Sequence, residues 1–197
     1  MYGYVKRAMD ILFALVLLLV LSPLLLILML VLTVTTRGKP FFKQQRAGRF
    51  GKPFYIYKFR SMVVDAPPHM PTSDFENANH YITKFGHFLR KFSLDELPQL
   101  WNVLKGEMSF IGPRPVILAE AELLRERQKR GADKVRPGIT GIAQLHGRDL
   151  VDLEHKTRYD AYYASHRGFL LDTRVFFSTI WCVLTRRGVK DETPKNQ

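Results

Sequence analysis

The chain has 197 residues and carries 30 lysines and arginines against 18 aspartates and glutamates, a formal charge of +12 at pH 7. This length suits one domain with a single core, and the charge indicates an anionic partner: a nucleic acid, an acidic lipid surface or a phosphorylated substrate. The one cysteine, Cys182, excludes an intrachain disulfide and agrees with a reducing compartment.

A long apolar segment lies near the start of the chain, where Ile11 to Val34 is a run without a formal charge. The run exceeds the roughly 18 apolar residues that identify a membrane segment. No small-residue cleavage pattern follows it, which argues against a removed signal peptide. Ser22 and Pro23 lie at its middle, where proline removes a backbone hydrogen bond and bends a helix.

Basic residues flank this apolar run on both sides: Lys6 and Arg7 before it, and Arg37, Lys39, Lys43, Arg46 and Arg49 after it. Basic flanks prefer the cytosol, so a kinked helix that enters the bilayer and returns satisfies both ends. A spanning helix with a tolerated proline is the alternative, and the residues by themselves leave both open. In either case the more basic C-terminal flank places the rest of the chain in the cytosol.

One or two short strands with a turn are predicted for residues 39–62, where short runs of aromatic residues are broken by glycine and proline. The proline-rich segment Asp65–His80 is predicted to be a loop, of a size that often covers a site. Apolar residues at helical spacing predict helices at residues 82–92 and 94–104, and Gly106 ends the second helix.

The C-terminal half begins with SFIGPRP, Ser109–Pro115, a short strand that enters a proline-fixed turn. A charged surface helix is predicted for Val116–Arg130, and a structured loop for the glycine-rich segment Val135–Asp149. Helices at Leu153–Ser165 and Phe169–Arg187 follow. The last helix has a wide apolar face, which favours a helix partly in the core and partly in the membrane interface. An ordinary core helix is the alternative.

Two adjacent acids, Asp95 and Glu96, occur in a chain that has few acids. The segment Ser93–Glu96 fits a capping box, in which Glu96 would reach back to the Ser93 amide, and this is a purely structural alternative. A helix start also offers free N–H groups and a positive potential, which bind phosphate and keep a carboxylate ionised, as a nucleophile must be. One acid can then attack phosphorus while the other binds Mg²⁺.

Cationic side chains that could bind phosphate oxygens occur in apolar or proline-fixed surroundings. They are Lys58, Arg60, Arg90, Arg114, Arg136 and Arg148. Any one of them could be a solvated surface charge. Together, and beside a membrane segment, they favour a diphosphate substrate that meets a lipid.

Several motifs and the Ser-Pro-kinked segment resemble those of the small monotopic phosphoglycosyl transferases, a family of bacterial sugar transferases. The motifs are YKFRSM, SLDELPQLWNVLKGEMSFIGPRP and VRPGITGIAQLHGRD. The likeness runs from about Tyr4 to about Gly188. It implies a helix that enters one leaflet and returns to the cytosol, which selects the re-entrant alternative.

The expected fold is α+β and mainly helical. Residues 1–36 are expected to form the re-entrant membrane helix, kinked at Ser22 and Pro23. Residues 37–188 are expected to form a compact cytosolic catalytic domain with short strands and interfacial amphipathic helices, and residues 189–197 a flexible tail.

The resemblance implies a Mg²⁺-dependent enzyme that moves a sugar-1-phosphate from a UDP-sugar to polyprenyl phosphate, such as undecaprenyl phosphate, and releases UMP. Asp95 matches the family's nucleophile, which carries the phosphosugar covalently, and Glu96 its partner acid near the metal; both are expected metal ligands. Positions associated with substrate phosphates or nucleotide are matched by Arg90, Arg114 and Arg148, and Lys58, Arg60 and Arg136 lie in matching motifs.

The resemblance also implies a protein of the bacterial plasma membrane, with its catalytic domain on the cytosolic face and in contact with phospholipids. The donor is expected to carry an N-acetylated or deoxy-hexose, and the reaction to be the first membrane step of surface glycan assembly. No nucleic acid is expected as a partner. A homodimer, the exact sugar, and the choice among capsule, O-antigen and glycoprotein pathways are left open.

Two other classes of protein compete with this interpretation. A membrane-tethered nucleic-acid binder fits the charge, but the basic residues are dispersed among apolar motifs without a helix-turn-helix or RNP-like pattern. A structural membrane subunit whose acids only cap a helix would tolerate Asp95→Asn. The P-loop, H-E-x-x-H and C-x-x-C motifs of other enzyme classes do not occur.

Overall fold

The computed structural model describes residues 2–66, 78–147 and 152–185. Within these residues the chain is α+β and mainly helical, as predicted. The first half contains α1 Tyr2–Val20, α2 Ser22–Thr35, β1 Phe41–Ala47, η1 Arg49–Gly51, β2 Pro53–Phe59, α3 Ala78–Tyr81, α4 Lys84–Lys91 and η3 Leu94–Glu96. The second half contains α5 Gln99–Lys105, β3 Ser109–Ile111, α6 Ala121–Lys129, η4 Ala132–Lys134, β4 Gly138–Thr140, α7 Ile142–Leu145, α8 Leu153–His166 and α9 Phe169–Thr185.

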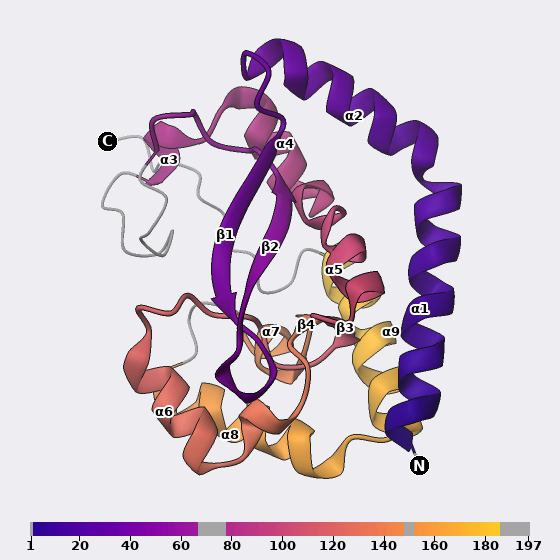
Figure 1. Ribbon diagram of the computed structural model, residues 1–197, viewed down its shortest axis with the longest axis vertical. Coiled ribbons are helices and arrows are strands. Elements are labelled where there is room, and N and C mark those ends of the chain that lie inside the picture. The colour runs from indigo at the N-terminus through magenta and orange to yellow at the C-terminus, as the bar shows by residue number, and fades with distance from the viewer. Residues whose placement is uncertain (1, 67–77, 148–151, 186–197) are drawn as a thin grey trace.

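A sharp bend separates α1 from α2, whose axes differ by 65° (Figure 1). Pro23 has no N–H, so the carbonyl of Leu19 four residues earlier lacks its helical donor. The Ser22 hydroxyl donates to that carbonyl at 2.7 Å. The predicted kink is therefore confirmed. No single helix in the described ranges is long and apolar enough to cross a membrane, although the bent pair passes the same test of length and composition.

Polar contacts fix the N-terminal end of α1 on the rest of the molecule. The buried carboxylate of Asp10 accepts from the Ser109 hydroxyl at 3.1 Å and from the Phe110 amide at 3.3 Å, at strand β3. Lys6 Nζ lies 2.7 Å from Asp172 Oδ2 on α9. These contacts join α1 to β3 and α9, elements that are about a hundred residues or more away along the chain.

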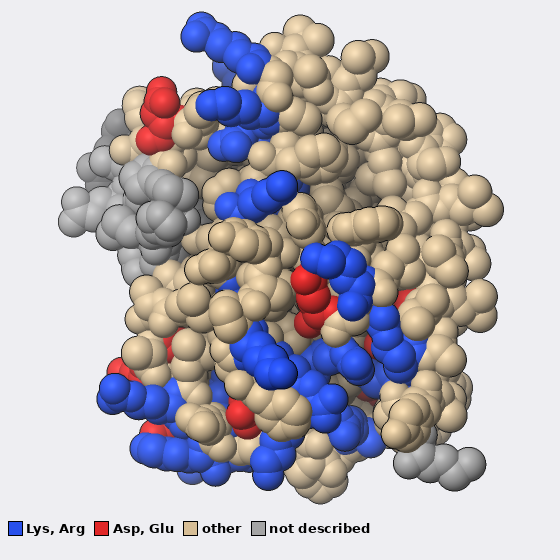
Figure 2. Space-filling view, in the orientation of Figure 1, with Lys and Arg blue, Asp and Glu red and all other residues tan. Residues whose placement is uncertain are grey.

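The outward faces of α1 and α2 are apolar. Their exposed large side chains include Leu12, Phe13, Leu15, Val16, Leu19, Val20, Leu26, Ile27, Leu30, Val31 and Val34. In Figure 2 the edge that these helices form carries few charged side chains, whereas lysines and arginines gather over the lower half of the same view. An apolar surface of this extent marks contact with a membrane or with another protein.

The ribbon at the centre of the molecule is formed by β1 and β2, which pair antiparallel with Phe41 opposite Phe59 (Figure 1). This confirms the predicted strands. Phe54 and Ile56 of β2 pack in a core cluster with residues of α1, α5 and the segment after α5, namely Ala14, Leu100, Val103 and Met108. The ribbon therefore lies against the helix that follows the acid pair.

A second, two-stranded sheet pairs β3 parallel with β4, with Ser109 opposite Gly138. Directly after β3 the backbone approaches the β4 segment closely, since a Cβ added to Gly112 would lie 2.4 Å from the Arg136 carbonyl oxygen. The structured loop predicted for Val135–Asp149 was wrong in part, because this segment contains β4 and the one-turn helix α7. The pairing of β4 with β3 is a long-range contact that local composition does not reveal.

The two predicted helices around the acid pair differ in outcome. The helix expected at residues 82–92 is confirmed as α4, capped by Thr83 Oγ1, which accepts from the Gly86 amide at 2.9 Å. The helix expected at residues 94–104 is divided at Leu97 and Pro98 into the short turn η3 and the helix α5, because Pro98 has no N–H to donate to the Leu94 carbonyl. The predicted stop at Gly106, with φ 83°, is confirmed.

The helix predicted for Val116–Arg130 begins only at α6. The Val116 carbonyl accepts from the Ala47 amide at 2.9 Å. Val116 is therefore bonded to the last residue of β1 and is not part of a helix. Side-chain burial supports this, since Val116 and Ile117 are both buried. A tertiary hydrogen bond therefore shortens the helix.

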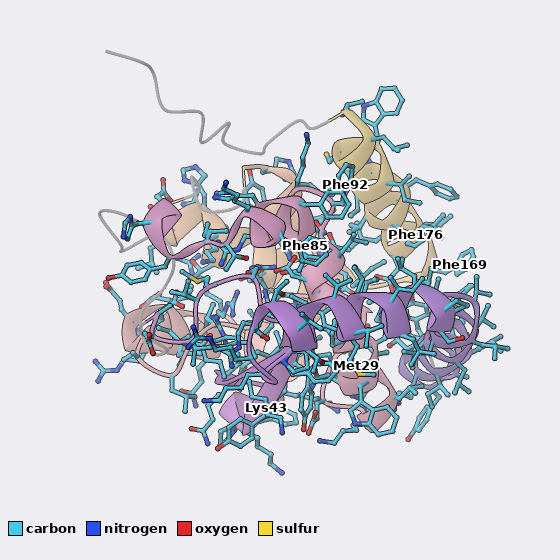
Figure 3. All side chains as sticks on the ribbon, turned by 90° about the horizontal axis from the view of Figure 1, so that it is seen from above. Met29, Lys43, Phe85, Phe92, Phe169 and Phe176 are labelled. Atoms are coloured by element: carbon cyan, nitrogen blue, oxygen red, sulfur yellow. The ribbon has the colours of Figure 1, made fainter. Side chains whose placement is uncertain are left out.

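The last helix, α9, has a buried side and an exposed side, as the width of its apolar face suggested. Val175 lies in a core cluster with Ile111 and Tyr163. Exposed apolar side chains on α9 include Leu170, Phe176, Phe177, Trp181 and Leu184. Figure 3 shows Phe169 and Phe176 on this helix projecting to the same side of the molecule as Phe92, which follows α4. Most of the predicted loop Asp65–His80, and the tail 189–197, lie outside the described residues.

Candidate active site

The acid pair lies in the tight turn η3, between the left-handed Ser93 and the start of α5. The Ser93 side chain makes no capping hydrogen bond. The Glu96 carboxylate points to cations on other segments instead of returning to the Ser93 amide. The capping-box alternative is therefore wrong, and the two acids require another explanation.

Glu96 is held by two cations from distant segments. Its Oε1 accepts from Lys58 Nζ of β2 at 2.8 Å and from Arg114 Nη2, in the turn after β3, at 3.1 Å. Burial by itself raises the pKa of Glu96, but the ion pairs with Lys58 and Arg114 outweigh it and bring the pKa well below its usual range. Glu96 is therefore a carboxylate throughout the physiological pH range.

Asp95 differs from its neighbour, because its carboxylate accepts no hydrogen bond from the described residues although the residue is only 8% exposed. Burial and the charge of Glu96 raise the pKa of Asp95, while Lys58, Arg90 and Arg114 act in the opposite direction. The sequence suggested that a helix start would keep this group ionised. In the structure Lys58, Arg90 and Arg114 favour the ionised form of Asp95 instead. Burial and the charge of Glu96 outweigh them, so the net shift of the Asp95 pKa is upward.

Each of the three cations is positioned by its own segment. Lys58 is aligned because the buried Asn102 of α5 accepts from the Tyr57 amide at 3.1 Å and thereby joins α5 to β2. Arg90 Nε donates to the Ser61 hydroxyl at 2.9 Å. Arg114 lies between two prolines, which restrict its backbone. Sequence-distant parts of the chain thus meet at the acid pair.

The other cations of the predicted site lie elsewhere. Arg60 donates to the backbone carbonyls of Lys39 and Phe41, at 2.8 and 3.1 Å. Arg136 Nε donates to the Gly106 carbonyl at 2.8 Å. In the structure both guanidinium groups therefore bind backbone at strand and helix ends, apart from the acid pair. Arg148 lies outside the described residues.

The sequence did not reveal a group of polar residues that lies next to the turn at Arg114. Arg46, expected only as a membrane-flanking charge, is largely buried, and burial followed by the nearby charge of Arg114 lowers its pKa to about 10. Arg127 and Asp160 form an ion pair that is almost fully buried. Arg46 shares the inward-facing side of β1 with the buried Gln44, and this alternation is the one signal that could have identified it.

Comparison with known proteins identifies the family of this chain. A model of the family described as bacterial sugar transferase matches residues 1–186. The chain belongs to this family. It is 38% identical over 187 residues to the uncharacterized sugar transferase EpsL of Bacillus subtilis, an alignment that covers 94% of this chain and 90% of that protein.

Other relatives in the family are longer. The chain is 38% identical over 206 residues to the undecaprenyl-phosphate galactose phosphotransferase of Salmonella typhimurium. It is 39% identical over 183 residues to the UDP-glucose:undecaprenyl-phosphate glucose-1-phosphate transferase of Escherichia coli. These alignments cover 94% and 89% of this chain but 41% and 39% of the two relatives.

The donor set at the acid pair fits Mg²⁺. This ion is usually bound by one or two carboxylates and takes its remaining ligands from substrate phosphates and water. Asp95 offers a carboxylate without a hydrogen-bond partner among the described residues, and Glu96 offers Oε2, since its cations bind Oε1. Within the same residues no group of three or more His, Cys, Asp or Glu side chains comes together, so a metal bound by protein ligands alone is not indicated.

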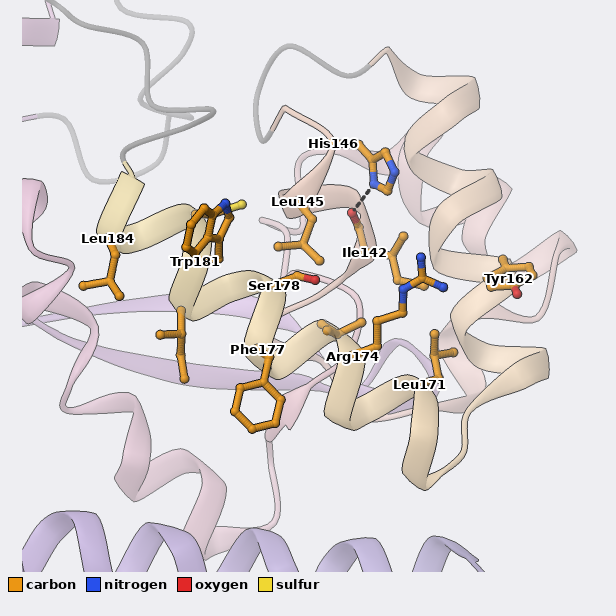
Figure 4. A pocket seen from close by; sticks show the side chains of 13 residues that line it. Ile142, Leu145, His146, Tyr162, Leu171, Arg174, Phe177, Ser178, Trp181 and Leu184 are labelled. Atoms are coloured by element: carbon orange, nitrogen blue, oxygen red, sulfur yellow. Dashed lines mark hydrogen bonds between the residues drawn. The ribbon is translucent and has the colours of Figure 1, made fainter.

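A separate groove of about 910 Å³ runs between α7, α8 and α9 (Figure 4). Its walls are mostly apolar and include Leu145, Leu171, Phe177 and Trp181, with Arg174 as the one arginine among the described residues that line it. Neither acid of the pair lines it. The groove continues the exposed apolar side of α9.

Proposed function

We propose that this protein transfers a sugar-1-phosphate from a UDP-sugar to a polyprenyl phosphate, such as undecaprenyl phosphate, through a phosphosugar bound covalently to Asp95. Family membership supports the general class, since relatives carry the names of undecaprenyl-phosphate sugar phosphotransferases. The division of labour between the two adjacent acids supports the covalent step.

The observation that carries the proposal is the contrast between Asp95, whose carboxylate accepts no hydrogen bond from the described residues, and the ion-paired Glu96. A nucleophile needs a lone pair that no donor occupies, and the Asp95 carboxylate accepts no hydrogen bond from the described residues. Lys58 and Arg114 lie close enough to lower the cost of bringing a diphosphate next to this carboxylate. Glu96 holds both cations in place.

In the first step an Asp95 oxygen forms a bond to the β-phosphorus of the UDP-sugar. The bond from that phosphorus to the bridging oxygen breaks, and UMP leaves with this oxygen and its electron pair. In the second step a phosphate oxygen of the polyprenyl phosphate attacks the same phosphorus and the aspartyl bond breaks. The carboxylate of Asp95 is regenerated, and the lipid carries a diphosphate-linked sugar.

Two-step transfer suits these substrates. The donor is soluble and the acceptor is a lipid, and a covalent intermediate allows them to use the site in turn. Mg²⁺, when bound, neutralises phosphate charge that would repel the attacking carboxylate. Asp95 and Glu96 are the residues that would bind it, and Arg90 and Arg114 would bind the phosphate oxygens.

We further propose that α1 and α2 form a re-entrant helix in one leaflet of the bacterial plasma membrane, with the remaining residues up to about 188 on the cytosolic face. The 65° bend and the exposed apolar faces of both helices support this arrangement. The exposed side of α9 fits the membrane interface beside it. Phospholipids are then constant partners of the protein.

The test is a screen of UDP-sugars with the purified full chain, Mg²⁺ and undecaprenyl phosphate, with UMP release as the measurement. Incubation with the active donor alone, followed by rapid quenching and intact-mass analysis, should detect a phosphosugar adduct on the protein. Release of UMP without any adduct in quenched samples would contradict the covalent step. Absence of UMP release with every donor would contradict the activity itself.

A further inference from the structure

We propose that Arg127, held by Asp160, is a positioning residue that fixes the turn carrying Arg114 and thereby directs Arg114 to the acid pair. This inference rests on the proposed function, because it assigns Arg127 a part in binding the donor phosphates through Arg114. Arg127 belongs to α6 and Asp160 to α8, and neither is part of the acid-pair motif.

The contacts of Arg127 join three segments. Its Nε and Nη2 both donate to Asp160 Oδ2, at 2.9 and 2.6 Å, and its Nη1 donates to the backbone carbonyl of Arg114 at 2.9 Å. Arg127 is 5% exposed and Asp160 is 2% exposed. Asp160 therefore fixes the direction of the Arg127 guanidinium, and the remaining Nη1 group donates to the Arg114 carbonyl.

The turn at Arg114 needs such a donor because its backbone is short of donors of its own. Pro113 and Pro115 have no N–H, so the turn is anchored through its carbonyls. The Pro113 carbonyl accepts from the Gly138 amide at 2.9 Å, the Arg114 carbonyl from Arg127, and the Pro115 carbonyl from Arg46 at the long distance of 3.4 Å. The contact from Arg127 is thus a short side-chain anchor at the centre of the turn.

The Arg114 side chain depends on this anchoring. Its side chain is 40% exposed, yet its Nη2 lies 3.1 Å from Glu96 Oε1, on a segment 18 residues earlier. The backbone position of Arg114 determines which side chains its guanidinium can reach, so holding the Arg114 carbonyl helps to place this guanidinium relative to Asp95 and Glu96. A buried ion pair contributes little net stability, so the consequence of this pair that we consider is the geometry that it imposes on the turn at Arg114.

The experiment compares the full chain in nanodiscs with the double variant Arg127→Met/Asp160→Leu, which removes the donor to Arg114 without leaving a buried charge unpaired. The control is Leu123→Ala, which removes a buried side chain from the same helix, one turn before Arg127, and leaves the contact to Arg114 intact. Steady-state UMP release gives the KM for the donor and kcat as separate quantities, and thermal unfolding reports stability.

We expect the double variant to raise the donor KM by about tenfold with a smaller change in kcat, because Arg114 is no longer held where it can bind the donor phosphates. The Leu123→Ala control should lower the unfolding temperature and leave both kinetic quantities near those of the wild type. In an Arg114→Ala background the double variant should add no further increase in KM, since the residue through which it acts is gone.

Equal KM values in the double variant and in Leu123→Ala would overturn the positioning role while the activity stands. A tenfold effect that persists in the Arg114→Ala background would overturn that role as well. If the wild-type chain releases no UMP from any donor, the proposed function fails, and this inference fails with it.

Discussion

Asp95 and Glu96 are neighbours in the chain, yet their pKa values are displaced in opposite directions. Burial raises both, but Lys58 and Arg114 bind Glu96 directly and reverse the shift there. Asp95 has no hydrogen bond of this kind within the described part of the chain. Two acids whose environments separate their pKa values are suited to two different roles, one reactive and one a permanent charge.

Replacing the reactive acid tests its role directly. Asp95→Asn should reduce UMP release by more than about 10³-fold, because an amide cannot form the acyl phosphate. The unfolding temperature should stay equal or rise, since the raised pKa shows that the fold disfavours the buried charge that the substitution removes. Membrane association should be unchanged. Retained turnover would remove Asp95 from the mechanism.

The partner acid should behave differently. Glu96→Gln should lower kcat/KM by roughly 10- to 100-fold, because Lys58 and Arg114 lose the carboxylate that holds them. If Glu96 also binds Mg²⁺, excess Mg²⁺ should partly restore the rate. The measurement is UMP release over a Mg²⁺ titration with and without EDTA. A wild-type enzyme indifferent to EDTA would exclude the metal role.

The pH dependence of kcat/KM should report Asp95. The nucleophile is active as the carboxylate, so the rate falls as the pH falls through its pKa, and a raised pKa moves this limb above that of an ordinary aspartate. Lys58 is the cation that lowers the Asp95 pKa most, so Lys58→Met should move the limb to still higher pH. Lys129→Met, at an exposed position on α6, is the matched control and should leave it unchanged. A limb that stays in place in Lys58→Met would contradict the assignment.

The kink should determine how the N-terminal segment enters the membrane. Pro23→Ala restores an N–H that can donate to the Leu19 carbonyl, so α1 and α2 should straighten towards a single spanning helix. Single cysteines placed near Tyr4 and near Lys39, in a Cys182→Ser background, report the side of each end by labelling. Leu26→Ala, on the exposed face of α2, serves as control. Identical labelling in all variants would refute the role of Pro23.

Asp172 should be important for stability. It accepts from Lys6 and from the hydroxyls of Tyr2 and Tyr163, so Asp172→Ala leaves one partly buried charge and two hydroxyl groups without this acceptor. We expect a loss of about 3 kcal/mol in the free energy of unfolding. Glu154→Ala, which removes an exposed pair with Arg158, should change it by less than about 0.5 kcal/mol. Chemical denaturation in detergent measures both.

Local features could be predicted well from the sequence. Pro23 bends a helix wherever it occurs in the interior, because it lacks an N–H, and Gly106 ends one because it adopts a left-handed conformation without strain. The antiparallel ribbon of β1 and β2 follows from a short turn between two aromatic runs. Each of these three features depends on residues that lie close together in the sequence.

Only the tertiary structure decided which cations serve the acid pair. Lys58 and Arg114 reach Glu96 across 38 and 18 residues of chain, whereas Arg60 and Arg136, equally plausible from their motifs, bind backbone carbonyls. The identity of a residue states what its side chain can bind, and the packing of distant segments decides what is within reach. For the same reason the buried pair of Arg127 and Asp160 had no signature along the chain.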